Sequence, residues 1–521
     1  MLLPVVIDVR VCHHPLADPC DCKQRRGGYV TEKDLYLYQH PDRQEAWLCA
    51  EVADETELAD EALVVTSIIV GERPSDPPSG AVWEKRDGEV WVLKQEFRNQ
   101  IDRAVTGVDV LYGADAVDPR PQWNLLQVPL QLDAPPEIPA ARLSFRRGRV
   151  KPKLDAQVLR IPENGKYRII QISDLHMIAG SGVCKDAMDA HGVYLRPVAA
   201  DPRTVGFIDE VLERWKPKLV ILTGDQVDHD VHDTQTALFK AVAPMEARGI
   251  PYATVFGNHD SEGTRALSRI EQMALLQSLP NCLSEPGPEE VDGVGNYIVH
   301  VFAAAPSKLP ALTLYLLDSH GAISGFLGKL LSKFRNRYDH VKRSQIQWFM
   351  KTCDEERRKC EKAKNDSALN LSLAFFHIPL PEFTNCDAGI RTGLRREPTE
   401  GPFYNSRFYE ILDKQGIAVI GTGHDHLNDF VAQSPQQAGQ DGKPNFCSGG
   451  SAGFGAYGKY GKERTYRRVR GYDFDANARS LTTWTHVEYG AGKVDELELV
   501  KDGVLLSPWD RVDKGSSRVV Q

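Results

Sequence analysis

Five short polar clusters stand out in the sequence, because each one directly follows an apolar run of the kind that forms buried β-strands. In chain order they are Asp174-Leu175-His176, Gly224-Asp225-Gln226-Val227-Asp228, Gly257-Asn258-His259-Asp260, the single His377, and Gly423-His424-Asp425-His426. Ligands of open α/β sheets bind outside the carboxyl ends of the strands, so we expect all five clusters to meet at one place. A lone strand-end aspartate or histidine is more often structural, whereas five in succession indicate a functional site.

The side chains of these clusters are of the types that bind transition metals. Seven of them offer a carboxylate, amide or imidazole ligand: Asp174, His176, Asp225, Asn258, His377, His424 and His426. This mixture suits Zn, Mn or Fe better than Ca or a thiolate-bound centre, and it does not choose among those three metals. One tetrahedral ion cannot use so many ligands, but two ions that share a carboxylate can. Two metals about 3.5–4 Å apart clamp the attacking and leaving oxygens of a displacement at phosphorus, which predicts phosphoester chemistry.

In this order, the clusters resemble the calcineurin-like metallophosphoesterase superfamily, whose pattern reads Asp-x-His, Gly-Asp-x-x-Asp, Gly-Asn-His-Asp, His and Gly-His-x-His. The resemblance implies one metal held by Asp174, His176 and His426, and a second held by Asn258, His377 and His424. It implies that Asp225 bridges the two metals and that a shared hydroxide is the nucleophile. His259 would face the phosphate and protonate the leaving oxygen, and Asp228 would orient His259.

Longer stretches narrow the resemblance to a branch that contains fungal cell-cycle phosphatases and plant purple-acid-phosphatase-like proteins. They are residues 375–382, 423–430, 445–450 and 457–459. The branch implies a phosphatase, and its fungal members imply phosphoprotein substrates. We therefore expect hydrolysis of phosphomonoesters, on phosphorylated proteins or on small phosphoesters. A phosphodiesterase acting on cyclic nucleotides or phospholipid head groups is the first alternative, because the same clusters serve both reactions. A non-catalytic scaffold is the second, although no ligand is lost here.

Three departures from related families bear on the chemistry. Asp228 stands where true purple acid phosphatases carry a tyrosine, and His176 stands where they carry a glycine, so no tyrosine-to-iron colour is expected. His229 replaces the arginine that follows this cluster in phosphoprotein phosphatases. Phosphate recognition must then use another group. The candidates are Arg265, Lys459 and Lys185, although basic residues of this kind are more often solvated surface charges.

The elements that position the clusters alternate between strands and helices, which is typical of an α/β fold. Short apolar runs predict buried strands at 168–173, 219–222, 252–256, 312–317, 371–376 and 417–420. Helices are predicted between them, over about 234–248 with a stop at Gly249, and over about 343–364. The dipeptide Asp201-Pro202 predicts another helix with Asp201 as its N-cap. The family resemblance adds that these elements form a two-sheet sandwich flanked by helices.

Residues 1–155 differ from the rest, because β-branched runs such as 62–70 alternate with turn-rich stretches such as 74–80. We therefore expect a β-rich N-terminal domain at 1–155, a metallophosphoesterase domain at 156–508 and a polar tail at 509–521. The first seven residues are interpreted as a β-strand rather than a signal peptide. The basic segment Arg142–Lys153 is interpreted as a charged strand or linker, with a nuclear-localisation patch as the alternative.

Composition limits the class of protein. With 63 basic and 72 acidic residues the net charge is −9, which argues against a general nucleic-acid binder. No apolar run is long enough to cross a membrane. The ten cysteines show no framework spacing, so free thiols in a cytoplasmic or possibly nuclear enzyme are expected. An alternative is a zinc site formed by Cys12, His13, His14, Cys20 and Cys22, with Cys49 as a further ligand. The acceptor-like sequences at Asn365 and Asn370 are interpreted as chance glycosylation matches.

Overall fold

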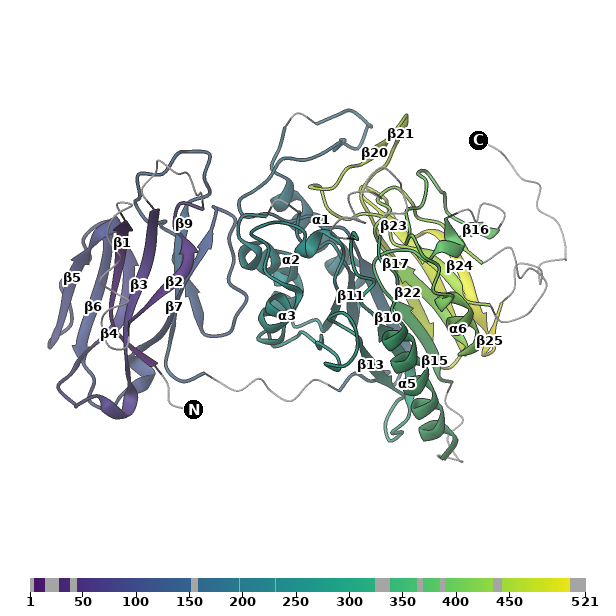
Figure 1. Cartoon of the computed structure of the whole chain (residues 1–521), viewed down its shortest axis with the longest axis horizontal. Coiled ribbons are helices and arrows are strands. Elements are labelled where there is room, and N and C mark those ends of the chain that lie inside the picture. Colours follow the sequence, from purple (N-terminus) through teal and green to yellow (C-terminus); the bar gives the residue numbers. More distant parts are fainter. Residues whose placement is uncertain are drawn as a thin grey trace.

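The chain is described from a computed structural model. The described residues are 4–14, 28–37, 45–150, 158–195, 197–229, 231–323, 338–362, 369–384, 389–433 and 443–506. Figure 1 shows a β-rich N-terminal region at one end, a layer of helices next to it, and two large sheets beyond the helices. The polar tail, Cys20, Cys22 and Asn365 lie outside the described residues, so the predictions that rest on them are not tested.

The N-terminal region is built from three small antiparallel sheets, ordered β1-β3-β2, β4-β6-β5 and β7-β9-β8. The strands are β1 (Pro4–His14), β2 (Gly28–Asp34), β3 (Glu45–Asp54), β4 (Leu63–Val70), β5 (Ala81–Arg86), β6 (Val90–Glu96), β7 (Val105–Tyr112), β8 (Trp123–Leu125) and β9 (Ala141–Arg147). Alternate residues such as Val6, Val65, Val92 and Val110 are fully buried in one common core. The predicted β-rich character of this region and its first strand are confirmed.

The first large sheet has seven strands in the order β12-β11-β10-β22-β23-β24-β25. The strands are β10 (Lys166–Ile172), β11 (Leu219–Thr223), β12 (Tyr252–Val255), β22 (Arg468–Asp475), β23 (Ser480–Val487), β24 (Val494–Lys501) and β25 (Val504–Leu505). β10, β11 and β12 are parallel, and the C-terminal strands add to β10 as antiparallel neighbours. The carboxyl ends of the three parallel strands therefore lie at one edge.

The second large sheet also has seven strands, in the order β13-β14-β15-β17-β19-β18-β16. They are β13 (Tyr297–Phe302), β14 (Pro310–Leu316), β15 (Leu371–Phe375), β16 (Ile390–Thr392), β17 (Ile417–Thr422), β18 (Val431–Ala432) and β19 (Asn445–Ser448). Its centre, β14-β15-β17-β19, is parallel. The strand ends that carry His377 and His424 thus emerge from neighbouring strands, β15 and β17.

Burial on both faces of each sheet explains the apolar runs. Ile169 of β10 packs in a core shared with the second sheet, whereas its neighbour Ile170 packs against helices. The first sheet is covered by α1 (Ala200–Trp215), α2 (Thr234–Arg248) and α3 (Arg269–Gln277), and the second by α5 (Arg343–Lys362) and α6 (Phe408–Lys414). The predicted two-sheet sandwich flanked by helices is confirmed. Among the described helices, none is both long enough and apolar enough to cross a membrane.

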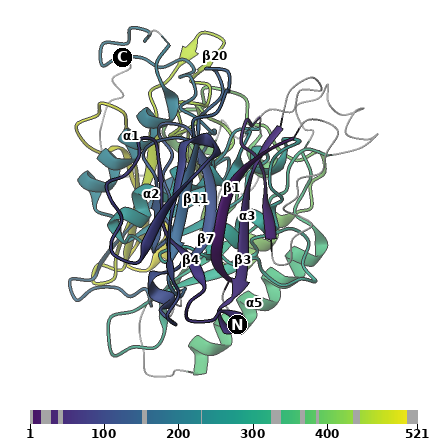
Figure 2. The same ribbon diagram turned by 90° about the vertical axis from the view of Figure 1, so that its left-hand side faces the viewer.

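The N-terminal sheets contact the remainder of the chain at α1 and α2, as the two views in Figures 1 and 2 show. The ammonium group of Lys240 in α2 lies 2.9 Å from Asp115, 2.6 Å from the Gly180 carbonyl and 2.5 Å from Asp201. The Lys240 side chain is only 2% exposed. One buried cation therefore joins the N-terminal region, the loop after His176 and helix α1.

The prediction of Asp201 as an N-cap is wrong. Helix α1 begins at Ala200, and its N-cap residue Ala199 makes no side-chain capping bond. Asp201 is buried inside the first turn and accepts a hydrogen bond from the Ile178 amide at 3.0 Å. Burial raises the pKa of Asp201 to about 6, against the opposing effect of Lys240. The Asp-Pro dipeptide correctly predicted the position of the helix, but the Asp201 carboxylate pairs with the distant Lys240 instead of capping the helix.

The expectation of free thiols throughout is also wrong, because Cys49 is disulfide-bonded. That bond removes Cys49 as a ligand of the alternative zinc site. Six other cysteines of the described chain form no disulfide: Cys12, Cys184, Cys282, Cys353, Cys360 and Cys447. The expectation of a reducing compartment rested on free thiols, and the disulfide of Cys49 does not support it.

Candidate metal centre

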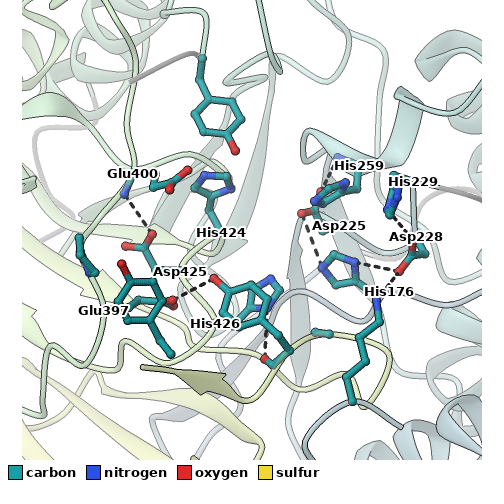
Figure 3. A pocket seen from close by; sticks show the side chains of 16 residues that line it. His176, Asp225, Asp228, His229, His259, Glu397, Glu400, His424, Asp425 and His426 are labelled. Carbon is teal, nitrogen blue, oxygen red and sulfur yellow. Dashed lines mark hydrogen bonds and ion pairs between the residues drawn. The ribbon is translucent and has the colours of Figure 1, made fainter. Parts of the chain in front are cut away.

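All five polar clusters meet at one edge of the sandwich, where the carboxyl ends of β10, β11, β12, β15 and β17 come together. A cavity of about 310 Å³ opens above them. Figure 3 shows the imidazole and carboxylate groups of its floor pointing toward one another. The lining residues are His176, Lys185, Asp225, Asp228, His229, His259, Tyr338, Glu397, Pro398, Glu400, His424, Asp425, His426, Ala456, Tyr457 and Tyr460. The predicted convergence is confirmed.

Two groups of three buried side chains have the spacing that a metal ion requires. The first is Asp174, His176 and His426, whose ligand atoms lie within 4.8 Å of one another. In this group Nε2 of His426 is 3.4 Å from Oδ1 of Asp174. All three side chains are almost fully buried, so their polar atoms have little access to water.

The second group is Asp225, His377 and His424, again with ligand atoms within 4.8 Å of one another. Nε2 of His377 is 3.2 Å from Oδ2 of Asp225 and 3.2 Å from Oδ1 of Asn258. The same Oδ2 of Asp225 lies 3.8 Å from Nε2 of His176, which belongs to the first group. Asp225 thus stands between the two groups.

The donor chemistry of the site fits metal ions. Nε2 of His176 and Oδ2 of Asp225 are buried and make no hydrogen bond within the described structure, although both point into the cavity floor. Burying a polar atom without a hydrogen bond costs about 1–3 kcal/mol. Metal coordination would satisfy them both. Carboxylate and imidazole ligands in this number fit the two divalent or mixed-valence ions of Fe, Zn or Mn expected from the sequence.

The backbone at the strand ends is unusual. Asp174, His176, Asp225 and His424 all have positive φ angles, of 56°, 49°, 52° and 75°. Left-handed conformations cost non-glycine residues about 1–2 kcal/mol, so the fold must enforce them. Three of these residues, His176, Asp225 and His424, line the cavity, and Asp174 lies buried beside His426.

Two glycines permit the close approach of these turns. A Cβ atom at Gly257 would lie 2.1 Å from Oδ1 of Asp225, and one at Gly423 would lie 1.8 Å from the Ser173 hydroxyl. Both separations are far below van der Waals contact, so neither position accepts a side chain. The glycines of the clusters are therefore required by packing around the ligands.

His259 lies beside the second metal group on a single 3₁₀ turn, η5 (His259–Ser261). Its amide donates to Oδ1 of Asp225 at 2.8 Å, and its Nδ1 lies 2.9 Å from Oε2 of Glu262. Burial alone would lower the pKa of His259, but the negative charges of Asp225 and Glu262 raise it to about 9. The imidazole of His259 lines the cavity.

The expected partnership of Asp228 with His259 differs from what the structure shows. Glu262 provides the carboxylate beside Nδ1 of His259. Asp228 instead lies 3.6 Å from Nδ1 of His176, 2.7 Å from Nδ1 of His229 and 3.5 Å from Nζ of Lys185. Burial would raise the pKa of Asp228, but these three neighbours hold it well below its usual range. Asp228 is thus a fixed negative charge beside the first metal group.

Of the three candidates for phosphate recognition, one reaches the cavity. Lys185 lines it. Arg265 instead donates to the Leu37 carbonyl at 2.8 Å, in the N-terminal region. Lys459 is exposed on the hairpin formed by β20 (Lys459–Tyr460) and β21 (Glu463–Arg464), outside the lining residues.

Sequence reasoning gave no role to two further groups that support the site. Asp260 accepts hydrogen bonds from the amides of Asp225, Gly257 and Val227 at 2.7–3.0 Å, so it ties the second cluster to the third. It belongs to the Gly-Asn-His-Asp cluster, which was a signal for its importance. The ring of Tyr457 stacks on the ring of His426 at 3.9 Å between centroids. Tyr457 donates to Glu397 at 2.9 Å, a contact between residues 60 apart that no local pattern indicates.

Two buried groups of carboxylate and imidazole ligands lie at the carboxyl edge of the two-sheet sandwich, an arrangement suited to binding metal ions that act on a phosphoester. The family model for calcineurin-like phosphoesterases matches residues 167–428 of this chain. The protein belongs to the calcineurin-like phosphoesterase family. The resemblance inferred from the five clusters is thereby confirmed.

Related proteins match more than half of the chain. It is 33% identical over 416 residues to Phosphatase DCR2 of Saccharomyces cerevisiae, across 77% of this chain and 67% of that protein. It is 35% identical over 342 residues to a protein of Arabidopsis thaliana named Probable inactive purple acid phosphatase 29, across 63% of this chain and 82% of that one. A dimetal phosphatase from Danio rerio gives a TM-score of 0.41 at 13% identity, over 64% of this chain and 99% of that one.

Proposed function

We propose that this protein is a metal-dependent phosphatase that hydrolyses phosphomonoesters, with phosphorylated proteins as its substrates. The observation that carries the proposal is the pair of buried ligand groups, with Asp225 between them and His259 beside them, under a single open cavity. Phosphatase DCR2 supports it as a relative by its printed name. The plant relative whose name calls it inactive raises the opposite possibility, yet this chain keeps all seven expected ligands.

In this proposal Asp174, His176 and His426 hold one metal, and Asn258, His377 and His424 hold the other. Asp225 holds both, because its Oδ2 faces both groups. A bound metal pair would lower the pKa of water and neutralise the oxygens of the phosphoryl group. The cavity admits the phosphate, and the charged His259 at its edge gives a proton to the leaving oxygen. Glu262 holds the His259 ring in position.

Metal content and two aryl substrates test this function directly. We expect about two Fe, Zn or Mn ions per chain by elemental analysis, and faster hydrolysis of 4-nitrophenyl phosphate than of bis(4-nitrophenyl) phosphate. Faster cleavage of the diester would replace the proposal with a phosphodiesterase. Fewer than one metal and no turnover after Mn or Zn is added back would indicate a binding scaffold.

Removal of the proton donor tests the assignment of His259. His259→Ala is expected to lower kcat by about 100-fold or more on a phosphoserine peptide, because proton transfer to a poor leaving group contributes about 10²–10⁴. The loss on 4-nitrophenyl phosphate should be smaller, since nitrophenolate leaves without a proton. Both metals should stay bound by elemental analysis. Loss of the metals, or equal losses on both substrates, would contradict the role, and His300→Ala on β13 is the control.

A further inference from the structure

We propose that Lys185 makes this site selective for dianionic phosphomonoesters over monoanionic diesters, by binding a terminal phosphate oxygen. The inference rests on the proposed function and adds the group that decides between its two candidate substrate classes. It starts from the position of Lys185 on the rim of the metal cavity.

The backbone of Lys185 is held at two points. Its amide donates to the Phe454 carbonyl at 2.9 Å, and its carbonyl accepts from Nη2 of Arg467 at 2.6 Å. Arg467 is itself buried, so this anchor is fixed. The segment therefore delivers the Lys185 side chain to the cavity in a defined direction.

The ammonium group of Lys185 lies beside the first metal group. It is 3.5 Å from Oδ2 of Asp228, and that carboxylate is in turn 3.6 Å from Nδ1 of His176. The Lys185 side chain is nevertheless 54% exposed, so two of its three donors remain available to a ligand. A phosphate that reaches the metal groups would come within range of it.

Lys185 differs in charge from most of the other ionisable residues that line the cavity. Among the described residues that line it, Lys185 is the sole lysine or arginine, whereas the carboxylates are Asp225, Asp228, Glu397, Glu400 and Asp425. His229 follows Asp228 in the chain, and its Nδ1 is held by Asp228 at 2.7 Å. Outside the metal groups, Lys185 is therefore the lysine or arginine of the described lining that a terminal phosphate oxygen can meet.

The number of charged oxygens distinguishes the two substrate classes. A monoester presents three terminal oxygens that share about two negative charges near pH 7, whereas a diester presents two that share one. Bound metals and His259 would serve the oxygens that both classes have. Lys185 meets the additional charged oxygen of the monoester, where a diester carries a neutral alkoxy or aryloxy group. A hydrogen bond to a charged group contributes about 1.5–3 kcal/mol, which corresponds to a factor of about 10–100.

The test compares Lys185→Met and Lys185→Arg with the wild type, and uses Lys459→Met as a nearby lysine outside the cavity. For Lys185→Met we expect kcat/KM on 4-nitrophenyl phosphate to fall about 10–100-fold, mainly through KM. On bis(4-nitrophenyl) phosphate it should change less than about threefold. Lys185→Arg should keep most of the monoester activity, and Lys459→Met should match the wild type.

Binding of inorganic phosphate separates this inference from the proposed function. Calorimetry on the metal-loaded protein should show a Kd for phosphate about 10–100-fold weaker in Lys185→Met, with the metal content unchanged. An unchanged Kd, or equal losses on monoester and diester, would overturn the role of Lys185 while leaving the phosphatase intact. A wild type that hydrolyses neither ester would contradict the proposed function, and the phosphate Kd would still decide the role of Lys185.

Discussion

Replacing Asp225 by asparagine is expected to empty the metal centre and lower turnover by about a thousandfold or more. Asp225 is the carboxylate that faces both ligand groups, at 3.2 Å from His377 and 3.8 Å from His176. Asparagine has the same size but no charge, so neither metal keeps its shared anionic ligand. Metal stabilisation of the transition state contributes several kcal/mol, and about 4 kcal/mol corresponds to a factor of 10³ in rate.

Elemental analysis and kinetics on the same preparation check this result, with circular dichroism to confirm folding. Asp228→Asn is the matched control, because Asp228 is a buried aspartate of the same cluster that belongs to neither ligand group. We expect Asp228→Asn to keep its metals. Two retained metals and more than a tenth of the wild-type activity in Asp225→Asn would show that the ligand assignment is wrong.

The second large effect is on stability. Lys240→Met is expected to lower the free energy of unfolding by about 3–5 kcal/mol, because removing one partner of a buried ion pair leaves an uncompensated charge. Lys240 is 2% exposed and lies within 3 Å of both Asp115 and Asp201. A substitution here also releases the Gly180 carbonyl, in the loop that follows the ligand His176.

Urea unfolding monitored by tryptophan fluorescence measures the loss. Lys85→Met serves as the control, because Lys85 pairs with Glu89 on the surface and such pairs contribute less than about 1 kcal/mol. The double variant Lys240→Met/Asp201→Asn should recover part of the stability, since it removes the unpaired carboxylate as well. An equal change in Lys85→Met and Lys240→Met would refute the buried network as a source of stability.

Much of the site was predictable, because its signals are local. Polar clusters that directly follow an apolar run mark the carboxyl end of a buried strand. Parallel pairing, as between β10 and β11, then brings these strand ends together at one edge of the sheet. The order of the ligands along the chain then identified the family. Helix α2 was predicted to end before Gly249 for a similar reason, since the helical segment and the glycine that ends it are consecutive in the sequence.

What escaped prediction depends on contacts between distant residues. Glu262, rather than the expected Asp228, lies beside Nδ1 of His259, because the short turn η5 brings residues three positions apart together. The sequence carries no periodic pattern that predicts such a short turn. The addition of β22 to β10 joins segments about three hundred residues apart, and the sequence pattern of a strand does not name its neighbour. The burial of Lys240 was not predicted, because lysines are usually exposed and its partner Asp115 lies far away in the sequence, in the N-terminal region.

The left-handed backbone of Asp174, His176, Asp225 and His424 has an evolutionary consequence. Glycine adopts this conformation without the steric cost, and asparagine at a reduced cost, so either substitution relaxes the chain as it removes a ligand. Random drift at these four positions therefore exchanges a metal ligand for a less strained backbone. Once selection for turnover is relaxed, a descendant of this fold is expected to lose its metals early and to keep, or even strengthen, its architecture.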